Sequence, residues 1–209
     1  MDGEGVGVQY EYACSDRLGR SDWNLRRPCP QFNYPGSYRF PYLQGTNAAF
    51  RRELLLRVGG FDEAFAYYLD ETELCLRVND AGYVIRQLSG AKVRHKMAAS
   101  GLREGRVILD HSPILKSKLY FSLRHGKKVH SGREIEKEWK RFVGEHQAVI
   151  SMWIRKGWAE ASQWEEFERR VQVSETWARQ RAGLPPVLLG WEEGKVLPQM
   201  EWVSFHSLP

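Results

Sequence analysis

Apolar residues recur mostly at intervals of three and four between Ser131 and Val171, and this periodicity limits the possible folds more than any other feature of the chain. Such spacing is typical of amphipathic helices, which bury one face against another element. Charges in this segment are eight of each sign, which favours a solvated outer face. We expect two or three helices, divided at Gly144 and Gly157 and packed on a sheet or a partner. The periodic residues are Ile135, Trp139, Phe142, Val143, Val149, Ile150, Trp153, Ile154, Trp158, Ala161, Trp164, Phe167 and Val171.

Upstream of this region, short apolar segments alternate with glycines, prolines and charges. Two helices are indicated: residues 51–58 end at Gly59, and residues 70–81 begin with acids and end before Gly82. Helices that alternate with strands predict the α/β class. The other segments are predicted as a strand over 5–12, a loop over 13–41, a strand or extended segment over 42–50, and short strands over 83–88 and 91–95.

The composition predicts a globular protein with one core, or one core and a small appendage. The chain has 209 residues, is 42% hydrophobic and contains eight tryptophans. Its first residues lack the basic and apolar regions of a cleaved signal peptide, and no run reaches the roughly 20 apolar residues of a spanning helix. Cys14, Cys29 and Cys75 are irregularly spaced, which favours buried thiols over a disulfide framework or a zinc site. We therefore expect a soluble, cytoplasmic protein.

The net charge of +5 is unevenly distributed along the chain. Residues 86–128 hold eleven Lys or Arg against two acids, whereas residues 61–80 hold six acids against Arg77 alone. A basic block beside an acidic one suits a site that binds a phosphate-bearing ligand near a working carboxylate. Charge alone favours a plainer interpretation, in which the basic residues form a solvated face or a patch for anionic lipid or nucleic acid. The basic block contains no recognisable nucleic-acid-reading motif, so no nucleic-acid partner is expected.

The acids at 70–73 lie in the first turn of a predicted helix. Carboxylates are common there because they stabilise the positive end of the helix dipole. A carboxylate held ionised in this way can also accept a proton from a substrate hydroxyl, as a general base. Asp70 and Glu71 are adjacent and point in different directions, so only one of them is expected to face the reacting centre.

The wider segment 45–95 contains several linked motifs in a fixed order, and this order resembles the acceptor-side half of inverting family 2 glycosyltransferases of the GT-A fold. A looser likeness extends from Gly5 to Gly126. The resemblance implies a partial GT-A-like α/β sheet followed by an α-helical C-terminal region. The motifs are Gly45 and Asn47, the helix start Arg51-Arg52, the turn Gly59 to Glu63, the helix residues Asp70, Glu71, Leu74 and Arg77, then Ala81-Gly82-Tyr83, and finally His95.

The resemblance implies a role for each matching residue. Glu71 takes the position of the base that deprotonates the acceptor hydroxyl, with Asp70 as the fallback, since the pair usually reads Glu-Asp in this family and is reversed here. The implied partners are a nucleotide-sugar donor and a glycan or lipid-linked acceptor, and the complete enzyme is expected to use Mn²⁺ or Mg²⁺. The other implied sites are Gly45, Asn47, Asp62, Tyr67 and Tyr68 for the acceptor sugar, Arg94, Lys96 and Arg103 for the diphosphate, and His95 for the metal. Asp62 is also a candidate cap of the next turn, and the sequence favours that role.

The family's nucleotide site is an N-terminal βαβ half that ends in an Asp-x-Asp motif, and this chain has no Asp-x-Asp. We therefore expect a C-terminal portion of a transferase, arising from a start codon assigned too late, a remnant, or a nucleotide half supplied separately. The expected divisions are a GT-A-like half over 1–128, a helical region over 129–184 and an irregular tail over 185–209.

A non-catalytic binding or assembly module is the alternative interpretation. Such a module would use the basic block 86–128 and the tryptophan-rich helices to bind a partner or an anionic membrane surface. Either interpretation allows a peripheral position at the inner face of the membrane.

Overall fold

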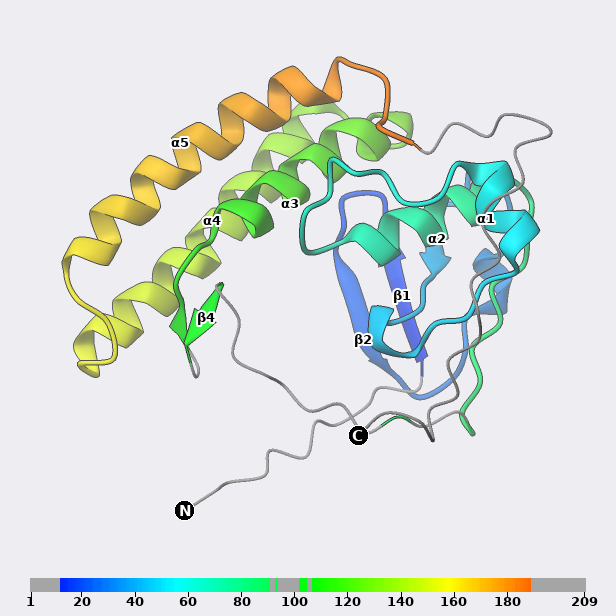
Figure 1. The fold of residues 1–209 in the computed structure, drawn as a ribbon, viewed down its shortest axis with the longest axis horizontal. Coiled ribbons are helices and arrows are strands. Elements are labelled where there is room, and N and C mark those ends of the chain that lie inside the picture. Colours follow the sequence, from blue (N-terminus) through cyan, green and yellow to red (C-terminus); the bar gives the residue numbers. More distant parts are fainter. Residues whose placement is uncertain (1–11, 91–92, 94–101, 105–106, 189–209) are drawn as a thin grey trace, which may run out of the picture.

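The computed structural model describes residues 12–90, 93, 102–104 and 107–188. These residues form a mixed α/β structure with a small antiparallel sheet and several helices (Figure 1). The helices α3, α4 and α5 lie along one side of the molecule, while α1 and α2 lie with the sheet on the other. The sheet and helix class agrees with the predicted α/β composition at this coarse level.

The main sheet has the strand order β2-β1-β3, with both pairs antiparallel. Its strands are β1 (Tyr12–Asp16), β2 (Ser21–Leu25) and β3 (Arg39–Pro41). All three lie in or overlap residues 13–41, so the prediction of a long loop there was wrong. Asp16 explains the first hairpin, because its Oδ1 atom accepts hydrogen bonds from the backbone N–H groups of Leu18 and Arg20 at 2.9 and 3.0 Å.

The two predicted upstream helices are confirmed. They are α1 (Arg52–Val58) and α2 (Asp70–Asp80). Gly59 ends α1 in the left-handed region with φ of 81°, where a residue with a Cβ is strained. Shorter 3-10 turns occur at Pro30–Phe32, Gly45–Asn47 and Gly126–Lys128, so residues 42–50 contain a 3-10 turn and no strand.

Residues 83–88 run as an irregular segment, which corrects the predicted strand. Side chains from elsewhere satisfy the backbone groups that a neighbouring strand would otherwise satisfy. Asn33 bonds both the N–H and the carbonyl of Ile85, at 2.8 and 3.2 Å. Gln87 Nε2 donates to the carbonyl oxygens of Ala13 and Tyr42 at 2.6 and 2.9 Å. The predicted strand over 91–95 lies outside the described residues, apart from Val93, and the predicted strand over 5–12 does so apart from Tyr12. A small hairpin follows, formed by β4 (Arg103–Glu104) and β5 (Val107–Ile108).

The C-terminal half forms α4 (Gly132–Arg155) and α5 (Ser162–Ala182), which confirms two amphipathic helices. Ser131 begins α4 with a capping box to Glu134. Helix α4 runs through Gly144 without a break, contrary to the prediction, because an interior glycine costs only about 1 kcal/mol and buried residues anchor the helix on both sides. Gly157, with φ of 67°, lies just beyond its end, as predicted.

Helix α3 (Ser112–His125) was not predicted from the sequence. It lies between the sheet side and the other two long helices, and it contacts both α4 and α5 (Figure 1). Ten of its fourteen residues are buried, so its sequence lacks the one-sided apolar pattern that marks a surface helix. In the sequence, Lys116 and Lys118 of this helix were counted with the basic block 86–128.

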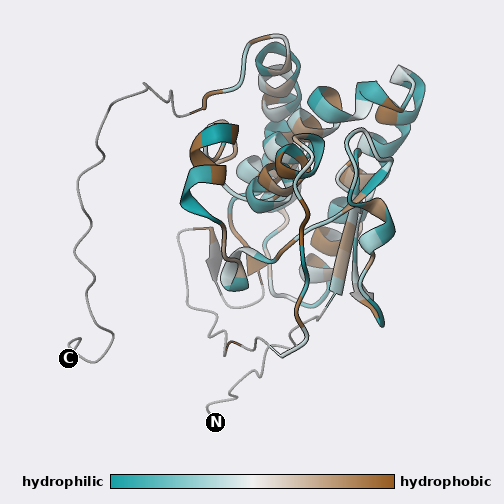
Figure 2. Ribbon diagram, turned by 90° about the vertical axis from the view of Figure 1, so that its right-hand side faces the viewer, coloured by the Kyte–Doolittle hydropathy of each residue, from teal (hydrophilic) through white to brown (hydrophobic). Residues whose placement is uncertain are grey.

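A single apolar cluster connects the sheet, α2 and the three long helices, and Figure 2 shows the hydrophobic residues of these helices concentrated toward the interior. Cys14, Cys29 and Cys75 are free and buried in it or beside it, as the sequence predicted. The core also contains charged groups: Arg17 is fully buried, and it donates through Nε to the Ser37 carbonyl at 2.8 Å and through its guanidinium to Asp80.

Acidification should weaken the packing of α3, α4 and α5. His111 is 5% exposed at the start of α3, its Nε2 atom has no partner among the described residues, and it packs edge-on against His146 and Phe167. Burial, helped by His146 and Arg170, lowers the pKa of His111 from 6.5 to about 4. The unfolded chain therefore takes up a proton first as pH falls. The His111 imidazole should therefore contribute a loss of up to about 3 kcal/mol between pH 6.5 and pH 4, while the raised pKa of Glu71 contributes in the opposite direction.

Urea unfolding followed by tryptophan fluorescence at several pH values measures this loss. The His111→Phe variant should keep its stability at pH 7 and, between pH 6.5 and pH 4, lose less stability than the wild-type protein by up to about 3 kcal/mol, because Glu71, His146 and Glu73 titrate in both proteins. An unchanged slope in that variant would contradict the assignment to His111.

Candidate functional site

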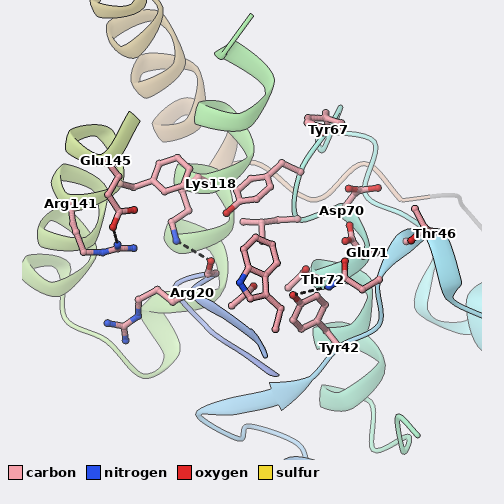
Figure 3. Close-up of a pocket in the computed structure, with 18 residues that line it drawn as sticks. Arg20, Tyr42, Thr46, Tyr67, Asp70, Glu71, Thr72, Lys118, Arg141 and Glu145 are labelled. Carbon is pink, nitrogen blue, oxygen red and sulfur yellow. Dashed lines mark hydrogen bonds and ion pairs between the residues drawn. The ribbon is translucent and has the colours of Figure 1, made fainter. Parts of the chain in front are cut away.

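A pocket of about 850 Å³ opens between the start of α2, the β1–β2 hairpin and α4 (Figure 3). Side chains from five separate parts of the chain converge on it. The carboxylates of Asp70 and Glu71 lie on one side, and Arg20, Lys118 and Arg141 lie on the other. The lining residues are Gly19, Arg20, Ser21 and Trp23; Tyr42, Gln44, Gly45 and Thr46; Tyr67 to Thr72; Lys118; and Arg141, Phe142 and Glu145.

The backbone just before the carboxylates is strained. Tyr68 and Leu69 have φ values of 74° and 64°, a left-handed conformation that costs a residue with a Cβ about 1–2 kcal/mol. Such strain persists only where the surrounding packing enforces it, and it is concentrated at functional sites. Leu69 is 4% exposed, and Tyr68 stacks on Phe142 with ring centroids 6.0 Å apart. These contacts hold the start of α2 against the pocket.

Gly19 makes room for this arrangement. A Cβ on Gly19 would lie 2.9 Å from Leu69 Cδ1, and the glycine has φ of 70°, so a larger residue is excluded on two grounds. Gly19 in the hairpin turn therefore lets the strained segment at Tyr68 and Leu69 pack closely against that turn. This packing is what places the first turn of α2 at the pocket wall.

Glu71 has the properties of a base that works near neutral pH. Burial, together with a hydrogen bond to Asp70 and the negative charge of Asp70, raises the pKa of its carboxyl from 4.5 to about 7. The backbone N–H of Gly45 opposes this rise by bonding to the carboxylate. A group with such a pKa can accept a proton from a hydroxyl and release it again at physiological pH.

The opposite wall is basic, but each cation has a carboxylate partner. Arg20 pairs with Asp16 at 2.6 Å, Lys118 with Glu138 at 2.9 Å, and Arg141 with Glu138 at 2.7 Å and also with Glu145. Lys118 is 1% exposed and donates to the carbonyl oxygens of Leu18 and Gly19 at 2.7 and 3.0 Å. Its burial lowers the pKa of the ammonium, and Glu138 offsets that effect. Lys118 therefore joins the hairpin to α3 and α4 as a structural group.

Five residues predicted from the sequence come together at this pocket: Gly45, Tyr67, Tyr68, Asp70 and Glu71. Asn47 lies in the same 3-10 turn as Gly45 but does not line the pocket. Arg94, His95 and Lys96 lie outside the described residues. Arg103 lies in β4, and its side chain is outside the described part of the structure.

Asp62 does not line the pocket, and its side chain takes the capping role that the sequence favoured over a contact with the acceptor. Its side chain is buried, Oδ1 accepts from the N–H groups of Ala64 and Val187, both at 3.0 Å, and Oδ2 accepts from the Tyr120 hydroxyl at 2.7 Å. Both carboxylate oxygens thus accept hydrogen bonds from groups inside the fold. Asp62 caps the local turn through the N–H of Ala64. It also holds the segment after α5 against this turn through the N–H of Val187.

The other lining residues were not singled out as site residues from the sequence, among them Arg20, Trp23, Arg141 and Glu145. These four come from β2, the hairpin turn and α4, which are separated from the acidic pair by many residues. No local motif marks them, because their role depends only on the folding of distant segments onto α2.

Among the residues that the structure describes, no group of three or more His, Cys, Asp and Glu side chains could hold a metal ion. Across the same residues, none of the helices combines the length and apolar character needed to cross a bilayer.

Comparisons with protein-family models, with curated proteins and with solved structures found no match to this chain.

Proposed function

We propose that this chain is the acceptor-side part of an inverting, family 2-like glycosyltransferase of the GT-A type. The observation that supports this most is the Glu71 carboxylate, which lies in a large pocket beside Asp70 with its pKa raised to about 7. Strained backbone directly before the pair supports a functional role for the same residues. The order of motifs in the sequence supplies the reaction class.

Glu71 would act on the acceptor. Its carboxylate removes the proton from an acceptor hydroxyl while that oxygen attacks the anomeric carbon of the donor sugar. The bond from the anomeric carbon to the diphosphate breaks, and its electron pair leaves with the nucleoside diphosphate. Because attack and departure occur on opposite faces, the configuration at the anomeric carbon inverts. Asp70 acts as a positioning residue that raises the pKa of Glu71.

The donor diphosphate is assigned to the basic segment that includes Arg94, Lys96 and Arg103. A divalent ion and His95 belong to the same proposal, but the described residues contain no set of ligands that fits a metal. The step at Glu71 is therefore derived without one.

The alternative binding module has fewer free cations available than the sequence suggested. Lys118 is buried, Lys128 pairs with Asp80 at 3.2 Å, Lys116 lies over the Trp177 ring, and Arg124 donates to the Leu184 carbonyl at 2.9 Å. These contacts stabilise the chain itself. Partner binding by the basic block would have to use its remaining residues.

A calorimetric titration of the protein, together with its nucleotide-binding half where that half is a separate polypeptide, with UDP-glucose, UDP-N-acetylglucosamine and GDP-mannose tests the proposal. We expect one of these donors to bind, and to bind more tightly with Mn²⁺ than without it, because the metal offsets the charge of the diphosphate. The corresponding free sugars serve as controls and should not show the metal effect. Absence of binding with and without Mn²⁺ would favour the non-catalytic module.

A further inference from the structure

We propose that the pocket binds an uncharged saccharide, with Trp23 and Tyr67 as the rings on which the sugar stacks. This inference rests on the proposed function and deepens it, because it names the chemical class of the acceptor. It assigns a role to Trp23, which the sequence motifs do not include.

The two rings are exposed at the pocket although they are large and mostly apolar. Trp23 is 53% exposed and Tyr67 is 44% exposed, and both line the pocket. They come from different elements, since Trp23 belongs to β2 and Tyr67 to the loop before α2. Aromatic rings at a binding site bury a large area at a small cost in conformational entropy, and they pack well against the C–H faces of a pyranose.

The charges of the pocket disfavour an anionic ligand. Arg20, Lys118 and Arg141 are each paired with a carboxylate, so the basic wall carries little unbalanced positive charge. Among the described residues, no cation pairs with Asp70 or Glu71. A carboxylate or phosphate on the ligand would meet these acids in a partly desolvated site, where repulsion is stronger than in water.

The remaining polar groups suit a ligand with many hydroxyls. Ser21, Gln44, Thr46 and Thr72 line the pocket with neutral donors and acceptors, and the two carboxylates can accept hydrogen bonds from sugar hydroxyls. Neutral polar groups combined with exposed rings favour a saccharide over a purely apolar ligand. The same balance of charge argues that the anionic donor diphosphate binds elsewhere, so the saccharide in this pocket is the acceptor.

Binding of neutral disaccharides measures the inference without requiring turnover. The probes are cellobiose, maltose and N,N′-diacetylchitobiose, with cellobiouronic acid as the anionic counterpart of cellobiose, and the readouts are tryptophan fluorescence and saturation-transfer NMR. We expect at least one neutral disaccharide to bind and the uronic acid to bind more weakly than cellobiose. Replacing both Asp70 and Glu71 with their amides should reduce this discrimination.

Trp23→Ala and Tyr67→Ala should each weaken binding of the neutral disaccharide by up to about tenfold, as expected for one stacked ring. Trp158→Ala is the matched control, since Trp158 is 45% exposed but lies beyond the end of α4 and does not line the pocket. Trp23→Phe keeps a ring and should retain most of the affinity, and circular dichroism shows whether each variant is folded.

Three results would overturn the inference: no neutral disaccharide binds, the uronic acid binds as tightly as cellobiose, or Trp23→Ala leaves the affinity unchanged. Saccharide binding without any binding of a nucleotide sugar would remove the proposed transferase function and leave the saccharide site standing. Nucleotide-sugar binding without saccharide binding would remove only the inference made here.

Discussion

Replacing Glu71 with glutamine is expected to lower sugar transfer by about 100- to 10,000-fold while leaving donor binding nearly unchanged. Glutamine keeps the size and hydrogen-bonding capacity of the side chain but cannot accept the proton of the acceptor hydroxyl. The assay is release of nucleoside diphosphate from a nucleotide sugar in the presence of a saccharide acceptor. It is run on this chain, together with its nucleotide-binding half where that half is a separate polypeptide.

The pH profile separates a base from a structural carboxylate. Since Glu71 works in its ionised form and its pKa is raised to about 7, kcat/KM should rise through pH 7 rather than near pH 4.5. The hydrogen bond and charge of Asp70 contribute to the raised pKa, so Asp70→Asn should move this rise to lower pH. Full turnover by Glu71→Gln would remove Glu71 from the role, and an unmoved profile in Asp70→Asn would remove Asp70 as the residue that sets the pKa.

Replacing Glu73 with alanine is expected to destabilise the protein by about 3–5 kcal/mol, the cost typical of breaking a buried ion pair. Glu73 is fully buried, both of its carboxylate oxygens accept from the single Nε–H of Arg77 at 2.8 and 2.9 Å, and its Oε1 lies 3.2 Å from His125 Nε2. Although burial opposes it, bonding to His125 and Arg77 keeps the pKa of Glu73 below its ordinary value. The substitution leaves the Arg77 guanidinium without its carboxylate in the interior.

The loss should extend beyond one pair, because Arg77 also donates to the carbonyl oxygens of Val58 and Gly60. Arg77 thereby links α2 to the glycine turn after α1. Urea unfolding at pH 7 measures the free energy. Glu166→Ala is the matched control, because Glu166 forms the same i,i+4 pair with Arg170 on an exposed face and should change stability little. Equal effects of the two substitutions would refute the assigned importance of burial.

Local signals predicted the helices and part of the site. Gly59, the acids at 70–73 and the glycine at 82 mark α1 and α2 through interactions within a few residues, and the Glu73–Arg77 pair follows from its spacing alone. The apolar periodicity of residues 131–171 likewise predicted that this region forms amphipathic helices, which are α4 and α5. Strands β1 to β3 were missed because they lie in a stretch rich in Gly, Pro and Arg, and their pairing is held partly by the Asp16 side chain.

The sequence by itself determined where α1 and α2 begin and end, and it singled out Asp70 and Glu71 as an acidic pair at a helix start. Only the tertiary structure decided what surrounds them. Burial turned the Glu73–Arg77 pair from a surface contact of a few tenths of a kcal/mol into part of the core. The fold also brought Trp23 and Arg141 to the pocket and raised the pKa of Glu71. Helix caps depend on neighbours in the chain, whereas burial, electric field and pocket shape depend on segments that are distant in sequence.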